Sequence, residues 1–536
     1  MRKTAAFLVV FLVLFSVVAA GCIGGGGGST SSSESSTKST TSSASQTTTS
    51  TTTSNEYTVS PSETTTSTQG ETTTSQTQTT TSPTQTTTTT PQTTTTVTHT
   101  TTTPQQGNVE LIILTRHDTT IQSLAKEYFL KSDIAKEYHI TKIRFIKATE
   151  SQWVEFIKRG VADVGWGGGP TLFDTLYTEG YLAPITDEKI LSLLGTNISE
   201  TIAGMPMVRK DNDGKVYWIA AALSSFGFTE NKKALQKWGL PEPKKWEDIA
   251  SEAWARDPPQ YGIADPTRST SNTRIYQIIL QAFGWDQGWR ILTLIAANSR
   301  IYDASDAVRE AVIAGDIAAG NTIDFYGYTA MQLNPDCVYI IPEGESIING
   351  DPIALLKSSK HPEAAQAFIY WVLTEGQKIW LNKEVNRLPV NPSIFNTPEG
   401  QQRQDLRTAY YLALHTRGIQ FDDERALKTI YAMQQYFKAT LVDTNEELHR
   451  AWMAIVNAHK SGKIDDQTFE RLKDELTAPI QFKDPETGET VTFTEEYAEK
   501  INDKILKDPN FKDTIVQEWR DAAKAKYQKV LQEVNG

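Results

Sequence analysis

Cysteine is almost missing from this sequence, and an excess of basic charge is missing altogether. Only Cys22 and Cys337 occur, far apart and in different surroundings, which argues against a structural disulfide and leaves packing to stabilise the fold. The 52 lysines and arginines face 64 aspartates and glutamates, so the net charge is -12. A chain with this charge balance is not expected to bind nucleic acid.

The short motifs of common enzyme classes are absent too. The sequence has no Gly-x-Ser-x-Gly elbow, no His-Glu-x-x-His zinc motif and no Gly-Lys-Ser/Thr phosphate loop. His117 beside Asp118 is the nearest approach to a catalytic pair, and two neighbours in one loop are a weak basis for catalysis. We therefore expect a protein that is not an enzyme and has no cofactor. A secreted enzyme and a structural surface protein are the alternatives from other classes.

The N-terminal segment predicts an exported and tethered chain. Residues 1–22 have a basic start, an apolar stretch and the ending Ala-Ala-Gly-Cys, as in a signal peptide whose Cys22 is lipidated. Residues 23–108 are glycine and then almost only Thr, Ser, Gln and Pro, a composition that cannot bury a core and predicts a disordered stalk. We expect Cys22 or the uncleaved leader to anchor the chain at the extracellular face of the membrane.

The folded part is organised around residues 161–174, where an apolar strand breaks into three glycines before a helix begins. Glycines let a ligand approach the main chain, and the first N–H groups of a helix attract negative charge. The stretch is equally consistent with an ordinary turn between a strand and a helix. Gly168, Gly169 and Thr171 are its candidate ligand-binding residues.

Three further loops repeat this pattern of strand, polar loop and helix. The loop at 265–272 offers an arginine and four hydroxyls, which favours an oxyanion or a polyol over the alternative, a helix that is merely well capped. The candidate ligand-binding residues of the three loops are Arg116, His117, Arg268, Ser269, Thr270, Ser271 and Ser305. The alternation of strands and helices predicts a largely parallel α/β sheet, with these loops at the carboxyl ends of the strands.

Two tyrosines complete the candidate site. Tyr326 and Tyr328 lie in an aromatic stretch that we predict as the end of a strand. Residues two apart on a strand point the same way, so both rings would face a cleft, although a place in the buried core is nearly as consistent.

Residues 109 to about 395 resemble the extracellular solute-binding proteins of ABC importers, in the ferric, phosphonate and thiamine branch. The leader and the Thr/Ser-rich stalk are similar to those of archaeal lipoproteins. The resemblance rests on segments that occur in the family's order: 162–169 with 180–184, 265–270, 303–305, 341–344, and 361–365 with 374–377.

This resemblance implies a two-lobed α/β fold of the periplasmic-binding-protein type II class, with mixed sheets, hinge strands and an extra helical C-terminal region. It places lobe 1 at 109–224 with 351–395, lobe 2 at 225–350, and crossing segments near 224–228 and 351–356. A small solute would bind in the cleft, and the closed monomer would dock on an ABC permease.

Departures from the family pattern bear on the ligand. Ferric-binding members use adjacent tyrosines, whereas Gly327 separates Tyr326 from Tyr328 here. We therefore expect a small anionic or polyhydroxylated solute. The alternative is ferric iron or an iron chelate, bound by His117, Tyr326 and Tyr328.

The C-terminal region, 396–536, exceeds what the family needs. A helical stripe of apolar residues in it is expected to pack on lobe 2 rather than to bind a partner: Leu427, Ile430, Met433, Phe437 and Leu441. Asn197 begins an Asn-Ile-Ser acceptor for glycosylation, which predicts a surface loop.

Overall fold

The computed structural model describes residues 108–536, without the side chains of Glu150 and Ser151. This region begins with a parallel sheet of three strands. Its elements are β1 (Val109–Thr115), α1 (Thr119–Lys131), α2 (Asp133–Glu137), β2 (Ile140–Lys147), α3 (Glu150–Lys158), β3 (Val164–Trp166), α4 (Pro170–Thr178) and α5 (Glu188–Leu191). β1 pairs in parallel with β2 on one side and with β3 on the other. The predicted alternation of strands and helices is confirmed, and the glycine turn follows β3 as expected.

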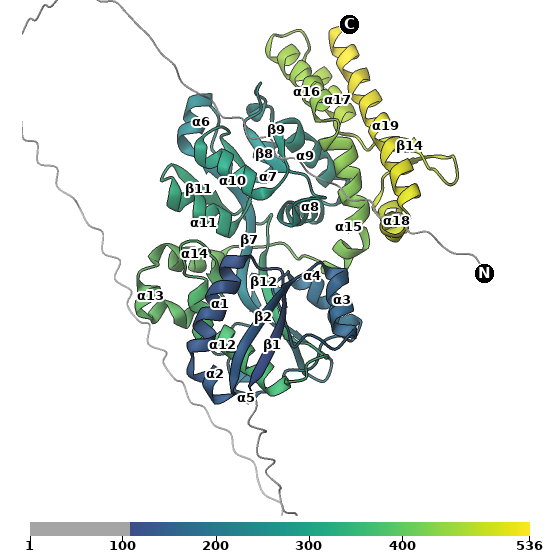
Figure 1. The fold of residues 1–536 in the computed structure, drawn as a ribbon. Helices are drawn as coiled ribbons and strands as arrows, with labels where there is room; N and C mark the ends of the chain where they lie inside the picture. Colours follow the sequence, from purple (N-terminus) through teal and green to yellow (C-terminus); the bar gives the residue numbers. More distant parts are fainter. Residues whose placement is uncertain (1–107) are drawn as a thin grey trace, which may run out of the picture. The chain divides into compact units, whose positions relative to one another are not determined.

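Two antiparallel strands, β7 (Val216–Asn231) and β12 (Ile348–Leu355), join this sheet to the second half of the fold (Figure 1). The first half of β7 pairs with β12, and its second half, from Phe226 onward, pairs with β10 (Ala319–Ile323). Every residue of β7 except Tyr217 is buried, which suits a strand covered on both faces. The predicted crossing segment at 224–228 is therefore part of one continuous strand.

The second half of the fold repeats the parallel arrangement. Its elements are α6 (Lys232–Trp238), α7 (Trp246–Ile249), β8 (Tyr261–Ala264), α8 (Thr270–Phe283), α9 (Trp285–Ala297), β9 (Ser299–Tyr302), α10 (Ser305–Ala314), α11 (Asp324–Leu333) and β11 (Cys337–Ile340). β8 pairs in parallel with β9 and β10, and the path across the whole sheet is β2-β1-β3-β12-β7-β10-β8-β9. Short strands β6 (Val208–Lys210), β11 and β13 (Leu388–Pro389) also pair with β7. The predicted α/β fold with mixed sheets is confirmed.

The segment with the two tyrosines is a helix and not a strand. β10 ends at Ile323 and α11 begins at Asp324, so Tyr326 and Tyr328 lie about 200° apart around a helix. Tyr326 lies under the guanidinium of Arg309, whose Cζ is 4.6 Å from the ring centre, whereas Tyr328 packs on Tyr339. The prediction that both rings face one cleft is wrong, because the alternation argument holds only for a strand.

The chain then adds helices to both halves. Following β12 are α12 (Pro362–Leu373), α13 (Pro398–Gln401), α14 (Gln404–His415), α15 (Asp423–Phe437), α16 (Asn445–Lys460), α17 (Asp466–Thr477), the hairpin β14 (Gln481–Lys483) and β15 (Thr490–Thr492), α18 (Glu495–Lys507) and α19 (Pro509–Asn535). A π-helix, Lys438–Val442, continues α15. α16 and α17 pack on α9, and α15 contacts both α8 and α4 (Figure 1).

An aromatic cluster holds the C-terminal helices to the second half of the fold. Trp519 of α19 is fully buried, and its ring contacts Tyr436 of α15 and Phe493 at centroid distances of 5.2 and 5.3 Å. Phe493 in turn packs on Trp285 and Trp289 of α9. Aromatic contacts of this kind add to the large apolar area that each ring buries, so the C-terminal helices share one core with α9.

Replacing Trp519 with alanine tests this shared core. Trp519→Ala should lower the free energy of unfolding by about 3–5 kcal/mol, because it removes a fully buried indole from a packed cluster. Chemical denaturation followed by circular dichroism measures the change. Leu506→Ala, at a leucine that is 53% exposed on α18, is the control and should change stability by at most about 0.5 kcal/mol. An unchanged midpoint in the Trp519 variant would show that the extension does not share the core.

Candidate functional site

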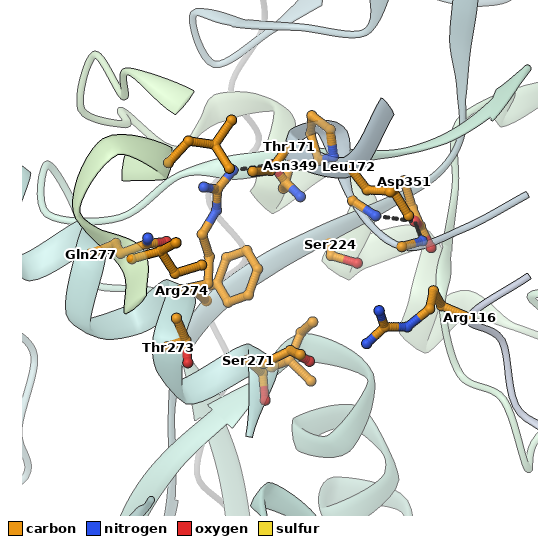
Figure 2. Close-up of a pocket in the computed structure, with 18 of the residues that line it drawn as sticks. Arg116, Thr171, Leu172, Ser224, Ser271, Thr273, Arg274, Gln277, Asn349 and Asp351 are labelled. Atoms are coloured by element: carbon orange, nitrogen blue, oxygen red, sulfur yellow. Dashed lines mark hydrogen bonds between the residues drawn. The ribbon is translucent and has the colours of Figure 1, made fainter. Parts of the chain in front are cut away.

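A cavity of about 350 Å³ lies where the two halves of the fold meet (Figure 2). The loop after β1 and the start of α4 line it from one half, and the first turns of α8 line it from the other. The crossing strands β7 and β12 and the helix α15 supply further residues. Its volume falls within the range of small-molecule sites, roughly 300–1,000 Å³.

The structure brings more than half of the predicted ligand-binding residues to this cavity. Those that line it are Arg116, His117, Gly168, Gly169, Thr171, Thr270 and Ser271. Those that do not line it are Arg268, Ser269, Ser305, Tyr326 and Tyr328. Loops from both halves therefore converge on one cavity, although fewer residues of the α8 and α10 loops reach it than the sequence predicted.

Arg268 points away from the cavity and into an ion pair. Its Nη1 lies 2.6 Å from Oδ1 of Asp303, and the two side chains are 58% and 74% exposed. Ser269 is the N-cap of α8, where its Oγ accepts from the N–H of Asn272 and lies 2.6 Å from Oγ of Ser305. The hydroxyls that the sequence grouped as one ligand-binding set thus divide between a helix cap and the cavity wall.

The glycine turn already holds a carboxylate of the protein. Gly167, Gly168 and Gly169 all have positive φ, and a Cβ at Gly167 would lie 2.5 Å from the ring of His117. The main-chain N–H groups of Gly168 and Gly169 donate to Oδ1 of Asp351 over 2.9 and 3.1 Å. The turn has the predicted bare backbone, but the two amides expected to meet a ligand bind Asp351 of β12 instead.

Arg387 pairs with the other carboxylate oxygen of Asp351. Nη1 of Arg387 lies 2.7 Å from Asp351 Oδ2, and Nη2 of Arg387 donates to Oγ of Ser224 over 2.9 Å. Burial alone raises the pKa of Asp351, but Arg387 and the two glycine amides outweigh it and hold that pKa below its usual value. Asp351 is therefore a charged, fully paired structural group.

His117 is neutral beside this pair. Burial lowers its pKa to about 4, and the positive charge of Arg387 acts in the same direction, although Asp351 opposes both. Arg387 Nη1 lies 3.4 Å from His117 Nδ1, and a guanidinium only donates, so Nδ1 accepts and the ring proton sits on Nε2. That Nε2 lies 3.9 Å from Asp351 Oδ2. In residues 108–536 no group of three or more His, Cys, Asp or Glu is placed to hold a metal ion.

A three-way contact joins both halves of the fold to α15. Oδ1 of Asp423 accepts from Arg274 Nη2 of α8 over 2.6 Å and from Thr171 Oγ1 of α4 over 2.9 Å. The guanidinium of Arg274 also lies over the ring of Phe421, with Cζ 4.1 Å from its centre. The charge of Arg274 is thereby neutralised in the cavity wall.

Arg116 differs from the other cavity arginines. Its exposed guanidinium points into the cavity (Figure 2), and no ion pair or hydrogen bond to it occurs within residues 108–536. Across the cavity, the N–H groups of Thr270 and Ser271 begin α8, where they have no intrahelical acceptor. Among the cavity residues of the described region, one free cation and one open helix N-terminus therefore face the same cavity.

Sequence reasoning missed the charged residues that shape this cavity. Arg274, Asp351 and Arg387 each stand alone in an otherwise apolar or uncharged segment, and each is at most 8% exposed. A lone charge in a buried segment must find a partner, which is the signal that could have marked them. Their partners are far away in the sequence, so the pairs themselves could not be read from it.

Several predictions fall outside the described residues or stay untested. The leader at 1–22, the lipidated Cys22 and the stalk at 23–108 lie outside residues 108–536, apart from position 108 itself. Asn197 is exposed on the loop after α5, as a glycosylation acceptor requires, and its modification stays a prediction. In the part of the chain that the structure describes, no helix combines the length and the apolar character needed to span a bilayer.

The buried neutral His117 predicts a pH effect on stability. Between about pH 6.5 and 4 the unfolded chain binds a proton at His117 that the folded chain does not, so the free energy of unfolding falls as pH falls, by at most about 3 kcal/mol. Asp324 and Glu230 oppose this trend, because burial raises the pKa of each to about 7. The difference between the wild type and His117→Gln isolates the histidine.

We expect the wild type to lose stability relative to His117→Gln as pH falls through this window. Urea unfolding at pH 7, 6, 5 and 4 measures the difference. Parallel curves for the two proteins would contradict a buried neutral imidazole.

Comparisons with known proteins show that the two halves of the fold are similar to a protein family. The model of the family described as bacterial extracellular solute-binding protein matches residues 113–379. Phosphoglycerate transport regulatory protein PgtC of Salmonella typhimurium and that of Salmonella typhi are each 29% identical over 242 residues, which cover 45% of this chain and 57% of theirs. The match therefore spans little more than half of these relatives.

Similar solved structures are distant in sequence. Iron-bound HitA from Pseudomonas aeruginosa is 19% identical, with a TM-score of 0.43 over 53% of this chain and 87% of HitA. AfuA from Actinobacillus pleuropneumoniae with fructose-6-phosphate bound is 16% identical, with a TM-score of 0.45 over 65% of this chain and 99% of AfuA. Residues 113–379, just under half of this chain, are thus similar to the bacterial extracellular solute-binding proteins, which are solute receptors and not enzymes.

Proposed function

We propose that this protein is the extracytoplasmic solute-binding receptor of an ABC import system and that its cavity takes a small organic anion. The observation that carries the proposal is the unpaired guanidinium of Arg116, which points into the cavity opposite the N-terminus of α8 (Figure 2). A guanidinium and open helix amides are the groups that bind phosphate and carboxylate best.

The charge balance of the wall supports an anion over a neutral solute. Arg387 is paired with Asp351 and Arg274 with Asp423, and His117 is neutral at physiological pH. Arg116 therefore leaves the cavity with a net positive charge. The named activity of the Salmonella relatives, phosphoglycerate transport regulation, is in keeping with a phosphorylated or carboxylated solute.

The transport cycle that we propose is hinge closure. The strands β7 and β12 connect the two halves of the fold, so a rotation about them would open the cavity, and a solute that touches both halves would favour the closed form. The closed monomer would then dock on the permease. We further propose that the N-terminal leader, through Cys22, and the Thr/Ser-rich stalk tether the receptor to the outer face of the membrane.

A ligand screen with two arginine variants tests the proposal. Thermal unfolding of the protein is followed with phosphoglycerates, sugar phosphates, phosphonates, neutral sugars, thiamine and ferric citrate. Organic anions should raise the melting temperature by mass action, and Arg116→Gln should weaken their binding at least about tenfold, the loss typical of a hydrogen bond to a charged group.

Arg268→Gln is the matched control. It removes the same charge from the neighbouring loop, where Arg268 is exposed and paired with Asp303, so it should leave the shift unchanged. A shift produced by neutral sugars or by ferric citrate alone, and unaffected in Arg116→Gln, would contradict an anion receptor.

A further inference from the structure

Helix α15 forms one wall of the cavity, although it lies outside residues 113–379, the segment that matches the family. The side chains that it contributes are Leu427, Ile430, Tyr431 and Gln434. Spacings of three and four residues put all of them on one face of the helix. The sequence grouped Leu427 and Ile430 with the packing residues of this helix, and the structure places them at the cavity.

The opposite face of α15 does the packing. Ala432 is fully buried there, and the buried ring of Tyr436 stacks on Phe493 with centroids 3.8 Å apart. Leu427 and Ile430 are only partly buried, because they face the cavity. Their apolar surface is thus available to whatever the cavity holds.

Hydrogen bonds fix this wall at one end of the cavity. Gln434 Nε2 donates to Thr273 Oγ1 over 3.1 Å, and Gln277 Nε2 donates to the carbonyl of Ala426 over 3.2 Å, so α15 lies on the α8 side. Figure 2 shows Gln277 and Arg116 at opposite sides of the cavity. The free cation and the apolar wall therefore face each other across the space where a solute would lie.

We propose that α15 sets the substrate class: the cavity selects organic anions that carry an apolar or aromatic portion beside the anionic group. This inference rests on the proposed function. The anionic group lies at Arg116 and the start of α8, and the apolar portion covers Leu427 and Ile430. Removing this apolar surface from water stabilises the complex, by about 25 cal/mol per Å². A polyhydroxylated anion of equal charge has no apolar portion to cover these side chains, so it does not gain this stabilisation.

Two phosphate monoesters of similar size test the selection. Phenyl phosphate and glycerol 3-phosphate carry the same charged group, and only the first has an apolar body. Isothermal titration calorimetry on the full chain should give a Kd for phenyl phosphate about tenfold lower, which corresponds to the burial of about two methylene equivalents. Leu427→Gln and Ile430→Gln should each reduce this ratio severalfold and leave the Kd of glycerol 3-phosphate unchanged.

Leu506→Gln is the matched control, since it makes the same change at an exposed leucine of α18 and should keep the full ratio. Thermal unfolding without ligand checks that each variant is folded. Equal affinities for the two esters in the wild type, or an unchanged ratio in both α15 variants, would overturn the inference. In that case a loss of binding in Arg116→Gln would still uphold the anion receptor. If neither ester binds, or if Arg116→Gln leaves the affinity for the esters unchanged, both the anion receptor and the inference are overturned.

Discussion

The carboxylate of Asp351 is the group on which the architecture of the cavity depends. It stands on the crossing strand β12, it accepts from both glycine amides of the turn before α4, and it pairs with Arg387. A buried charge is tolerated only when its partners replace the lost water, and here three donors from two segments do so. The same contacts fix the turn that begins α4. The strand that joins the two halves is thereby tied to the wall of the site.

This internal ion pair decides which groups are left for a solute. A strand, a glycine turn and a helix start make an anion site only while their amides are free, and at α4 the protein supplies its own anion. The groups of the cavity wall that remain open to a solute lie at Arg116 and at the N-terminus of α8, and we propose that recognition takes place there. Because Asp351 and Asp423 neutralise the neighbouring arginines, Arg116 is the one uncompensated cation of the cavity wall within residues 108–536, which is why we propose a solute with an anionic group.

The C-terminal extension is part of the site and not only of the scaffold. Asp423 at the start of α15 contacts α4 and α8 together, and the next two turns of that helix face the cavity. The far face of the helix joins the aromatic cluster around Trp519. One helix thus links the core that holds the extension in place to the wall of the cavity. Extending a common two-lobed fold in this way offers a route to a new specificity without a change in the hinge.

The sequence by itself determined the elements whose signal is local. Hydrophobic periodicity located β1, β3 and β8 and the helices α1, α4 and α8 that follow them, and the run of glycines marked the turn where Gly167, Gly168 and Gly169 have positive φ. It failed at Tyr326 and Tyr328, because aromatic residues are enriched in strands but also occur in helices, and here they lie in α11. Which residues share the cavity was decided by the tertiary structure alone: Arg268 and Arg116 are both arginines in polar loops, but one meets Asp303 and the other meets open space. Ion-pair partners that lie far apart in the chain cannot be recognised from local sequence patterns. The ion pairs of Asp351 and Asp423 therefore follow only from the fold, and so does the net charge of the cavity.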